Sequence, residues 1–235
     1  MIRLHQTNHT QQATYMITGA KKFVVAICAG AIGLVSLSAG SNLSKSLNTT
    51  YVDDVKPNYE SNFDALSWEF KVEAGGFHQI MTREFQPETL NYATANVLWG
   101  MMLYSPTGPG ILRGNTEFFM GINGGGFANG PGTYIAPGIM LALQYNFVQP
   151  GSRWVPIIGV NAGTVFVDPK LRTDYVGSSF NFTWSPYVGL RCFLNEKWSL
   201  QATFNYNHMS NADTTSNNHG IDGLGGMLGI SYFFK

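Results

Sequence analysis

The chain has 235 residues and no formal net charge, because 14 Lys and Arg residues balance 14 Asp and Glu residues. Charged residues make up 12% of the sequence, about half of the share that is usual in soluble domains. Mean hydropathy is nevertheless −0.03, and the one long apolar run covers residues 23–37, so a membrane protein built as a helical bundle is excluded. The sequence carries no basic patch, which excludes a nucleic-acid partner.

The N-terminal residues are typical of an export signal. A polar start with two lysines leads into the apolar run at 23–37, and small residues suited to signal peptidase follow it. We therefore predict a signal peptide over residues 1–40. Residues 41–65, rich in Ser, Asn, Thr and Asp, are expected to form a flexible lead-in. A retained membrane anchor is the alternative, although the apolar run is short for a span of about 20 residues.

From residue 66 onward, apolar side chains alternate with small or polar ones in segments of roughly ten residues. A period of two is typical of β-strands, and Gly, Pro, Asn and Asp separate the segments as turn residues do. We predict one domain over 66–235 that contains eight strands. The first strand begins near Trp68, and the others are expected at about 91–104, 115–124, 134–147, 154–167, 180–194, 198–210 and 220–234.

The two faces of these segments differ in a way that indicates a membrane barrel. In the first segment, Trp68 and Phe70 alternate with Glu69 and Lys71. One face is rich in Trp, Phe, Leu, Ile and Val, as lipid contact requires, and the other carries mostly Gly, Ala, Asn, Thr and Ser, which suits a narrow polar interior. We predict an all-β fold, an eight-stranded antiparallel transmembrane β-barrel of the outer-membrane type. A soluble lipocalin-like barrel would also alternate and is the alternative.

The last predicted hairpin carries the three residue types of a serine hydrolase. By strand parity, His208 and Ser210 share the lipid-facing side of one strand, and Asp222 lies on the same side of the next. A hairpin centred near residue 215 places His208 opposite Asp222. Ionisable side chains on a lipid-facing surface indicate function by default. We expect Asp222 to orient His208, His208 to accept the proton of Ser210, and Ser210 to attack an ester carbonyl.

An oxyanion formed by this attack needs fixed hydrogen-bond donors. Asn211, Asn218 and the backbone N–H groups of the turn at 211–213 are the candidates. His219 is an alternative base, but strand parity points its side chain the other way. A substrate that reaches this side of the barrel comes sideways from the bilayer, which favours an acyl ester of a lipid.

The motif at residues 208–212, His-Met-Ser-Asn-Ala, resembles the His-x-Ser-Asn-Ala motif of the lipid A 3-O-deacylases of Gram-negative outer membranes (PagL type). Asn218, Gly220 and Asp222 fall at the positions of the Asn, Gly and acidic residue that follow in that family. The resemblance implies an eight-stranded barrel, a His/Ser/acid triad, an Asn near the oxyanion, no metal or cofactor, and removal of the 3-linked acyl chain from the proximal glucosamine.

Two residues depart from the family pattern. Asp222 stands where the family typically has Glu, so the side chain is one methylene shorter. Asp213 stands where the family usually has Gly, which adds a negative charge beside the nucleophile. Either departure is expected to weaken activity or to shift the substrate.

The sequence therefore predicts a serine esterase of the outer membrane that acts on the lipid A of lipopolysaccharide, and it leaves a homodimer open. A non-enzymatic small barrel with a structural or adhesive role is the alternative; it would bind partners through the loops at 105–114, 124–133 and 168–179. A soluble lipid-binding barrel is a third interpretation, and it predicts recovery from the periplasm without detergent.

Overall fold

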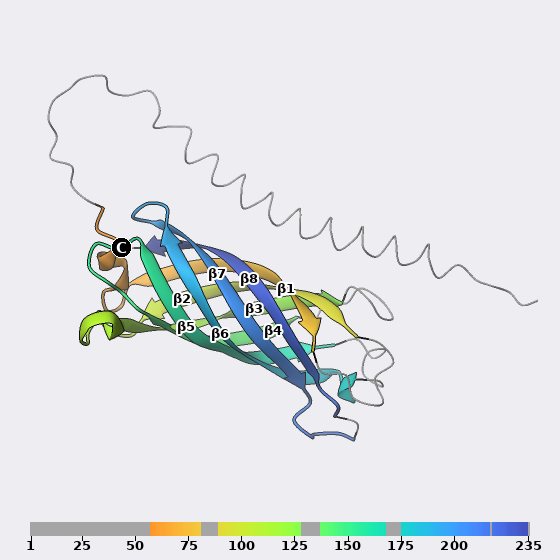
Figure 1. The fold of residues 1–235 in the computed structure, drawn as a ribbon. Helices are drawn as coiled ribbons and strands as arrows, with labels where there is room; N and C mark the ends of the chain where they lie inside the picture. Colours follow the sequence, from red (N-terminus) through yellow and green to blue (C-terminus); the bar gives the residue numbers. More distant parts are fainter. Residues whose placement is uncertain (1–56, 81–88, 128–136, 168–174, 217, 235) are drawn as a thin grey trace, which may run out of the picture. The chain divides into compact units, whose positions relative to one another are not determined.

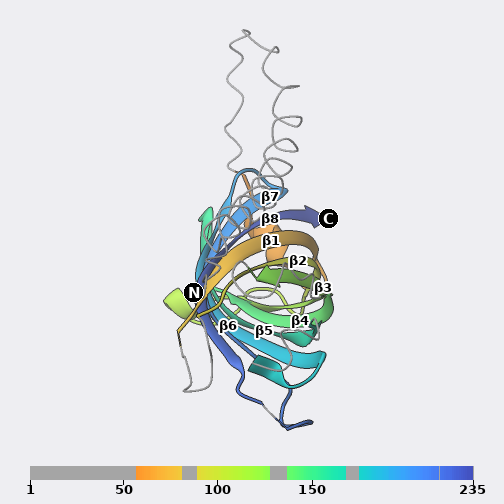
Figure 2. The same cartoon turned by 90° about the vertical axis from the view of Figure 1, so that its right-hand side faces the viewer.

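The computed structural model describes residues 57–80, 89–127, 137–167, 175–216 and 218–234. Within these ranges eight antiparallel strands close into a barrel, in which each strand pairs with its neighbours in sequence and the last pairs with the first (Figures 1 and 2). The predicted fold is thereby confirmed. The strands are β1 (Trp68–Gln79), β2 (Asn91–Met102), β3 (Asn115–Phe127), β4 (Gly138–Asn146), β5 (Trp154–Phe166), β6 (Phe180–Phe193), β7 (Trp198–Ser210) and β8 (Ile221–Phe234).

The expected strand positions hold with small shifts at the ends. β3 extends to Phe127, so the predicted loop at 124–133 begins later than expected. The predicted signal peptide at 1–40 and the expected start of the fourth strand at 134–136 lie outside the described residues. Among the residues that are described, no helix is long and apolar enough to cross a membrane.

Side chains alternate between the outside of the barrel, here called the outer wall, and its interior. Glu69 and Lys71 of β1 are fully buried inside, whereas Trp68 and Phe70 are exposed on the outer wall. Leu228 on β8 is 68% exposed, as lipid contact requires and water would disfavour. A soluble lipid-binding barrel turns its apolar face inward, and this barrel does the opposite. The faces therefore favour the transmembrane barrel over the soluble alternative.

Buried charges inside the barrel pair with one another. The Arg191 guanidinium donates to Glu69 at 2.9 Å and lies 3.6 Å from Glu117. The Lys71 ammonium lies 3.7 Å from Glu73 and packs over the ring of Phe119. Charges removed from water are tolerated when they are paired in this way. The interior thus links strands on different sides of the barrel rather than forming an open pore.

One end of the barrel, here called the terminal end, is where β1 begins and β8 ends. A cluster of aromatic side chains fills the interior at this end. Phe63 belongs to the short 3-10 helix η1 (Glu60–Phe63), is fully buried, and packs on Phe193 and Phe233. Helix η1 lies beside the C-terminal end of β8 in Figure 1, and a second 3-10 helix, η2 (Gly110–Leu112), lies at the same end. Residues 60–63 were expected in the flexible lead-in; the burial of Phe63 makes them part of the barrel's packing instead.

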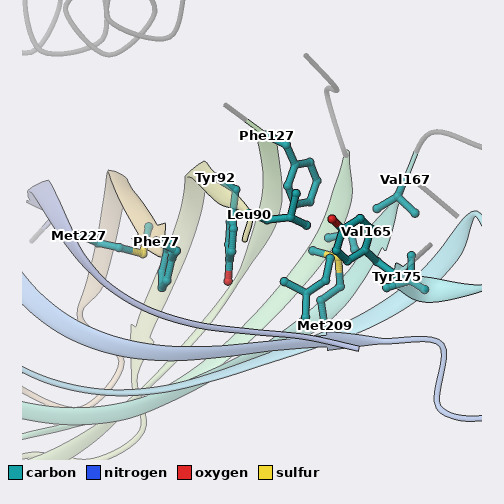
Figure 3. Packing of buried hydrophobic residues seen from close by; sticks show 11 residues of the cluster. Phe77, Leu90, Tyr92, Phe127, Val165, Val167, Tyr175, Met209 and Met227 are labelled. Atoms are coloured by element: carbon teal, nitrogen blue, oxygen red, sulfur yellow. The ribbon is translucent and has the colours of Figure 1, made fainter. Parts of the chain in front are cut away.

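The opposite end of the barrel, the hairpin end, is where β7 ends and β8 begins. Its interior holds an apolar cluster in which the rings of Phe77 and Tyr92 stack at 5.1 Å (Figure 3). Met209 and Ile221 of the last hairpin point into this cluster. Because neighbouring residues in a strand point to opposite faces, these two anchors hold the residues beside them on the outer wall.

Candidate functional site

The candidate site lies on the outer wall at the hairpin end, where β7 and β8 pair. His208 is directly opposite Asp222, and Met209 is opposite Ile221. The register predicted from the sequence is therefore confirmed. Inward anchoring of Met209 and Ile221 fixes this register, because a slip by one residue would move both side chains out of the apolar cluster and onto the outer wall.

His208 connects the acid to the serine through hydrogen bonds from both ring nitrogens. The Nδ1 atom lies 2.7 Å from Asp222 Oδ1, and the Nε2 atom lies 3.0 Å from Ser210 Oγ. A carboxylate only accepts, so Nδ1–H donates to Asp222, which leaves Nε2 to accept the hydroxyl proton of Ser210. The structure thus brings together the three residues that the sequence singled out, in the order acid, imidazole, hydroxyl.

Exposure falls from the serine side of this chain of hydrogen bonds toward the acid. The side chain of His208 is 26% exposed and Ser210 is half-buried, while the Asp222 side chain is 7% exposed. Asp222 faces the outer wall but is covered by its neighbours. The hydroxyl is therefore accessible from the lipid side, and the carboxylate that orients the imidazole is shielded.

Tyr206 is a member of the site that the sequence analysis missed. Its hydroxyl donates to Asp222 Oδ1, the same oxygen that accepts from His208. Tyr206 lies two residues before His208 on the same face, and it is therefore a diagonal neighbour of Asp222 across the strand pair. Strand parity was the signal that could have found it, because it places a tyrosine beside the acid on the outer wall.

The β6 side of the site is aromatic. Trp184 is the register partner of His208, and Phe182 is the register partner of Ser210. The Trp184 ring meets the ring of Tyr206 edge to face, with centroids 5.5 Å apart, and lies 6.3 Å from the imidazole of His208. The imidazole is thus held between an aromatic wall on β6 and the carboxylate on β8.

The turn after Ser210 is held by its own asparagines. The Asn211 backbone N–H donates to Asn218 Oδ1 at 3.0 Å, and Asn218 Nδ2 donates to Asp213 Oδ1 at 2.8 Å. The buried amide of Asn211 donates to the carbonyl oxygen of Val176 and to Thr215 Oγ1. Both asparagines named by the sequence analysis therefore lie in the connection that follows Ser210, and their described contacts shape this turn.

Three residues around the site have left-handed backbone conformations. Ala212 and Asp213 have φ angles of 53° and 59°, and Gly220 has a φ of 71°. Asp tolerates this region better than most residues other than Gly, which explains how Asp213 fits at a position where Gly is usual in the family that the motif resembles. A Cβ atom built on Gly220 would lie 3.2 Å from His208 Cε1, so this glycine also leaves room for the imidazole.

The described contacts bear on two further questions: which histidine lies at the serine, and whether the site could hold a metal ion. His208 is the histidine that is bonded to Ser210, whereas His219 lies before the start of β8. Across the described part of the chain, no group of three or more His, Cys, Asp or Glu residues is arranged to hold a metal ion.

An eight-stranded barrel with an apolar outer wall and a polar interior defines a small outer-membrane protein, here one with bonded Ser, His and Asp side chains on its lipid-facing side. The family model described as Lipid A 3-O-deacylase (PagL) matches residues 47–231, and the chain belongs to this family. It is accordingly a protein of the Gram-negative outer membrane.

Two solved structures are similar to this chain at low sequence identity, and the first of them shows the same fold. The crystal structure of the outer membrane enzyme PagL is 15% identical, with a TM-score of 0.53, and the match covers 68% of this chain and 97% of that one. The crystal structure of Neisserial surface protein A (NspA) is 14% identical, with a TM-score of 0.46, and covers 71% of this chain and 97% of that one. No curated protein matches the sequence.

Proposed function

We propose that this chain is a serine esterase that removes the 3-linked acyl chain of lipid A, with Ser210 as nucleophile, His208 as base and Asp222 as the orienting acid. One observation carries the proposal: the hydrogen bonds from Asp222 through His208 to Ser210 lie on the lipid-facing wall of a barrel in this family. An ester of a membrane lipid is the substrate that such a position can reach.

The first half of the reaction forms an acyl-enzyme. Ser210 Oγ attacks the ester carbonyl carbon while its proton passes to His208 Nε2 over the 3.0 Å hydrogen bond. Asp222 stabilises the imidazolium that results. Collapse of the tetrahedral intermediate breaks the bond to the sugar oxygen, which takes the proton from His208. Water then attacks the acyl-enzyme with the same base, and the fatty acid and free Ser210 are released.

The oxyanion of the intermediate needs donors beside Ser210. The Asn211 backbone N–H already donates to Asn218 Oδ1, so we assign this role to the backbone N–H groups of Ala212 and Asp213, with Asn211 and Asn218 holding the turn in shape. The support is that the side-chain amide of Asn211 already donates to two other groups. The Asn218 side chain likewise accepts from the Asn211 N–H and donates to Asp213. Successive left-handed residues can direct backbone N–H groups toward one anion.

The orientation of the barrel supports an outer-leaflet substrate. In outer-membrane barrels the periplasmic turns are short and the outer loops are longer. The connections at the hairpin end are longer on the whole than those at the terminal end, so the site faces the outer leaflet. They cover 80–90, 128–137, 167–179 and 211–220 at the hairpin end, and 103–114, 147–153 and 194–197 at the terminal end.

The test is mass spectrometry of lipid A from Gram-negative cells that express the full chain or its Ser210→Ala variant. We expect loss of one acyl chain with the wild type and intact lipid A with Ser210→Ala. Ser152→Ala, which changes a half-buried serine beside a turn at the terminal end, is the matched control and should deacylate like the wild type. Folding is checked for each by heat-dependent migration on gels.

Two outcomes would contradict the proposal. Intact lipid A with a folded wild type would favour the non-enzymatic structural or adhesive barrel, and deacylation by folded Ser210→Ala would remove Ser210 as nucleophile. The proposed steps use only this chain's side chains and water. A homodimer is not required by any of them, and it stays a prediction.

A further inference from the structure

We propose that Tyr206 is a positioning residue for this reaction: its hydroxyl holds the Asp222 carboxylate so that this short acid keeps His208 aligned with Ser210. The proposal rests on the proposed function and extends it to a residue outside the His-x-Ser-Asn-Ala motif. Tyr206 acts through Asp222, because its hydroxyl donates to the carboxylate.

Two donors converge on one oxygen of the acid. The Tyr206 hydroxyl and the His208 Nδ1–H both donate to Asp222 Oδ1. The tyrosine comes from the position diagonal to the acid, and the histidine comes from the position directly opposite. Because the two donors approach from different positions along β7, together they restrict both the rotation of the carboxylate and the place of the oxygen that faces the imidazole.

The shorter acid makes this restriction useful. A carboxylate that reaches the neighbouring strand on a single methylene has few rotamers that meet the imidazole, so the one that does must be favoured over the others. The outer wall also offers lipid rather than water to the site, and a carboxylate or a phenol there needs a partner. Pairing Tyr206 with Asp222 satisfies both groups at once.

Tyr206 is itself held rigidly. Its ring packs edge to face against Trp184, which also lies next to the imidazole of His208. Side chains from β6, β7 and β8 therefore hold Tyr206, Asp222 and His208 in place together. A hydroxyl on a fixed ring can set the geometry of its acceptor, whereas a hydroxyl on a mobile side chain would only follow it.

The experiment compares Tyr206→Phe with wild type in a detergent assay of lipid A deacylation. We expect kcat to fall on the order of tenfold, the usual effect of losing a hydrogen bond to a charged group, with KM little changed. Tyr145→Phe is the matched control, because Tyr145 also lies on the outer wall but donates to the Leu112 carbonyl oxygen near the terminal end. Its kcat should match that of the wild type.

A double-mutant cycle separates positioning from a general structural role. If Tyr206 acts through Asp222, Tyr206→Phe lowers kcat by a much smaller factor in an Asp222→Asn background than in the wild type. An equal fold-decrease in kcat in both backgrounds would show that the hydroxyl supports the fold and would overturn the proposal. An unchanged kcat in Tyr206→Phe would also overturn it.

The rate of labelling by a fluorophosphonate, which reacts with activated serines, distinguishes this proposal from the proposed function. Wild type that is labelled at Ser210 but leaves lipid A intact would reject the substrate and keep the site, and a labelling rate about tenfold lower in Tyr206→Phe would then still support the tyrosine. An equal labelling rate in the two would reject it. A folded wild type with no labelling and no deacylation would overturn both proposals.

Discussion

Two histidines on the outer wall have nearly the same local geometry. His78 of β1 lies opposite Asn91 of β2, and His208 of β7 lies opposite Asp222 of β8. In each pair the histidine Nδ1 atom is 2.7 Å from the partner's Oδ1 atom. Both pairs lie toward the hairpin end of the barrel. A cross-strand hydrogen bond to a histidine is thus a repeated structural feature of this wall.

The two pairs differ in the partner and in the next residue on the same face. The acceptor for His78 is a neutral amide, and two residues further, just past the end of β1, the chain reaches Ile80, which is 43% exposed. The acceptor for His208 is a carboxylate, and two residues further lies Ser210, bonded to Nε2. Under the proposed mechanism, an oriented histidine ring is not enough for catalysis; the carboxylate bonded to Nδ1 and the hydroxyl bonded to Nε2 distinguish the second pair from the first.

The largest expected effect comes from Asp222→Asn. This change places an amide opposite His208, as Asn91 lies opposite His78. An amide can present its NH₂ group to Nδ1 and so favour the wrong tautomer, and the loss of charge leaves the imidazolium unstabilised. We expect kcat for lipid A deacylation to fall by about 10³ to 10⁴, as for the same change in serine proteases. The rate is measured on purified, folded barrel in detergent.

Asn91→Asp is the matched control for this change. It gives His78 a carboxylate but no serine, so the deacylation rate should stay within about twofold of the wild type. A folded Asp222→Asn variant that keeps more than a tenth of the wild-type rate would show that the carboxylate is not needed.

Much of the fold could be predicted because each strand meets two different surroundings. Lipid outside and a polar interior inside impose a period of two, which is visible in the sequence of β1 as Trp68 and Phe70 alternating with Glu69 and Lys71. The same period placed His208, Ser210 and Asp222 on one face. Strand parity combined with the position of the turn then gave their register, which the structure bears out.

The contacts that were missed depend on side-chain conformations and turn geometry, which strand parity alone does not record. The partner of Tyr206 is set by rotamers on two strands, and the hydrogen bonds of Asn211 and Asn218 depend on the left-handed turn between them. Phe63 lies in a segment whose polar composition is typical of disorder, yet it fills a gap between Phe193 and Phe233 at the terminal end. Such long-range packing appears only once the barrel has closed.

The second prediction concerns the space beside the imidazole of His208. Gly220→Ala strains a backbone with a φ of 71° and sets a methyl group 3.2 Å from His208 Cε1. We expect the strain to destabilise the barrel by about 1 to 2 kcal/mol. The displaced ring should lower kcat on the order of tenfold or more, since small misplacements of catalytic groups are costly. Urea unfolding and deacylation rates measure the two effects.

Gly151→Ala separates strain from displacement. Gly151 has the same φ of 71° and nothing within 4 Å of a built Cβ atom, and it lies near the terminal end. It should lose similar stability with no change in rate. Equal rate losses in Gly151→Ala and Gly220→Ala would mean that backbone strain, rather than contact with His208, explains the result.

The third prediction removes the extra charge in the turn. Asp213→Asn keeps an acceptor for Asn218 and tolerates the left-handed backbone, so the turn should retain its shape. Loss of a negative charge near the developing oxyanion favours the transition state. Because Asp213 is exposed, the gain should be small, up to about fivefold in kcat. A fall in kcat would instead show that the charge itself holds the turn.

The smallest expected effect is that of His78→Gln, which tests whether the first pair contributes to the site at all. Glutamine can still donate a hydrogen bond to Asn91, and the residue two positions after His78 is Ile80, whereas Ser210 takes that position after His208. We expect kcat and KM to remain within about twofold of the wild type, and the free energy of unfolding in urea to remain within about half a kcal/mol. His78 faces Leu224 on β8, two residues from Asp222. A raised KM with unchanged kcat would therefore mean that lipid A extends across β1, and the two pairs would then belong to one binding surface.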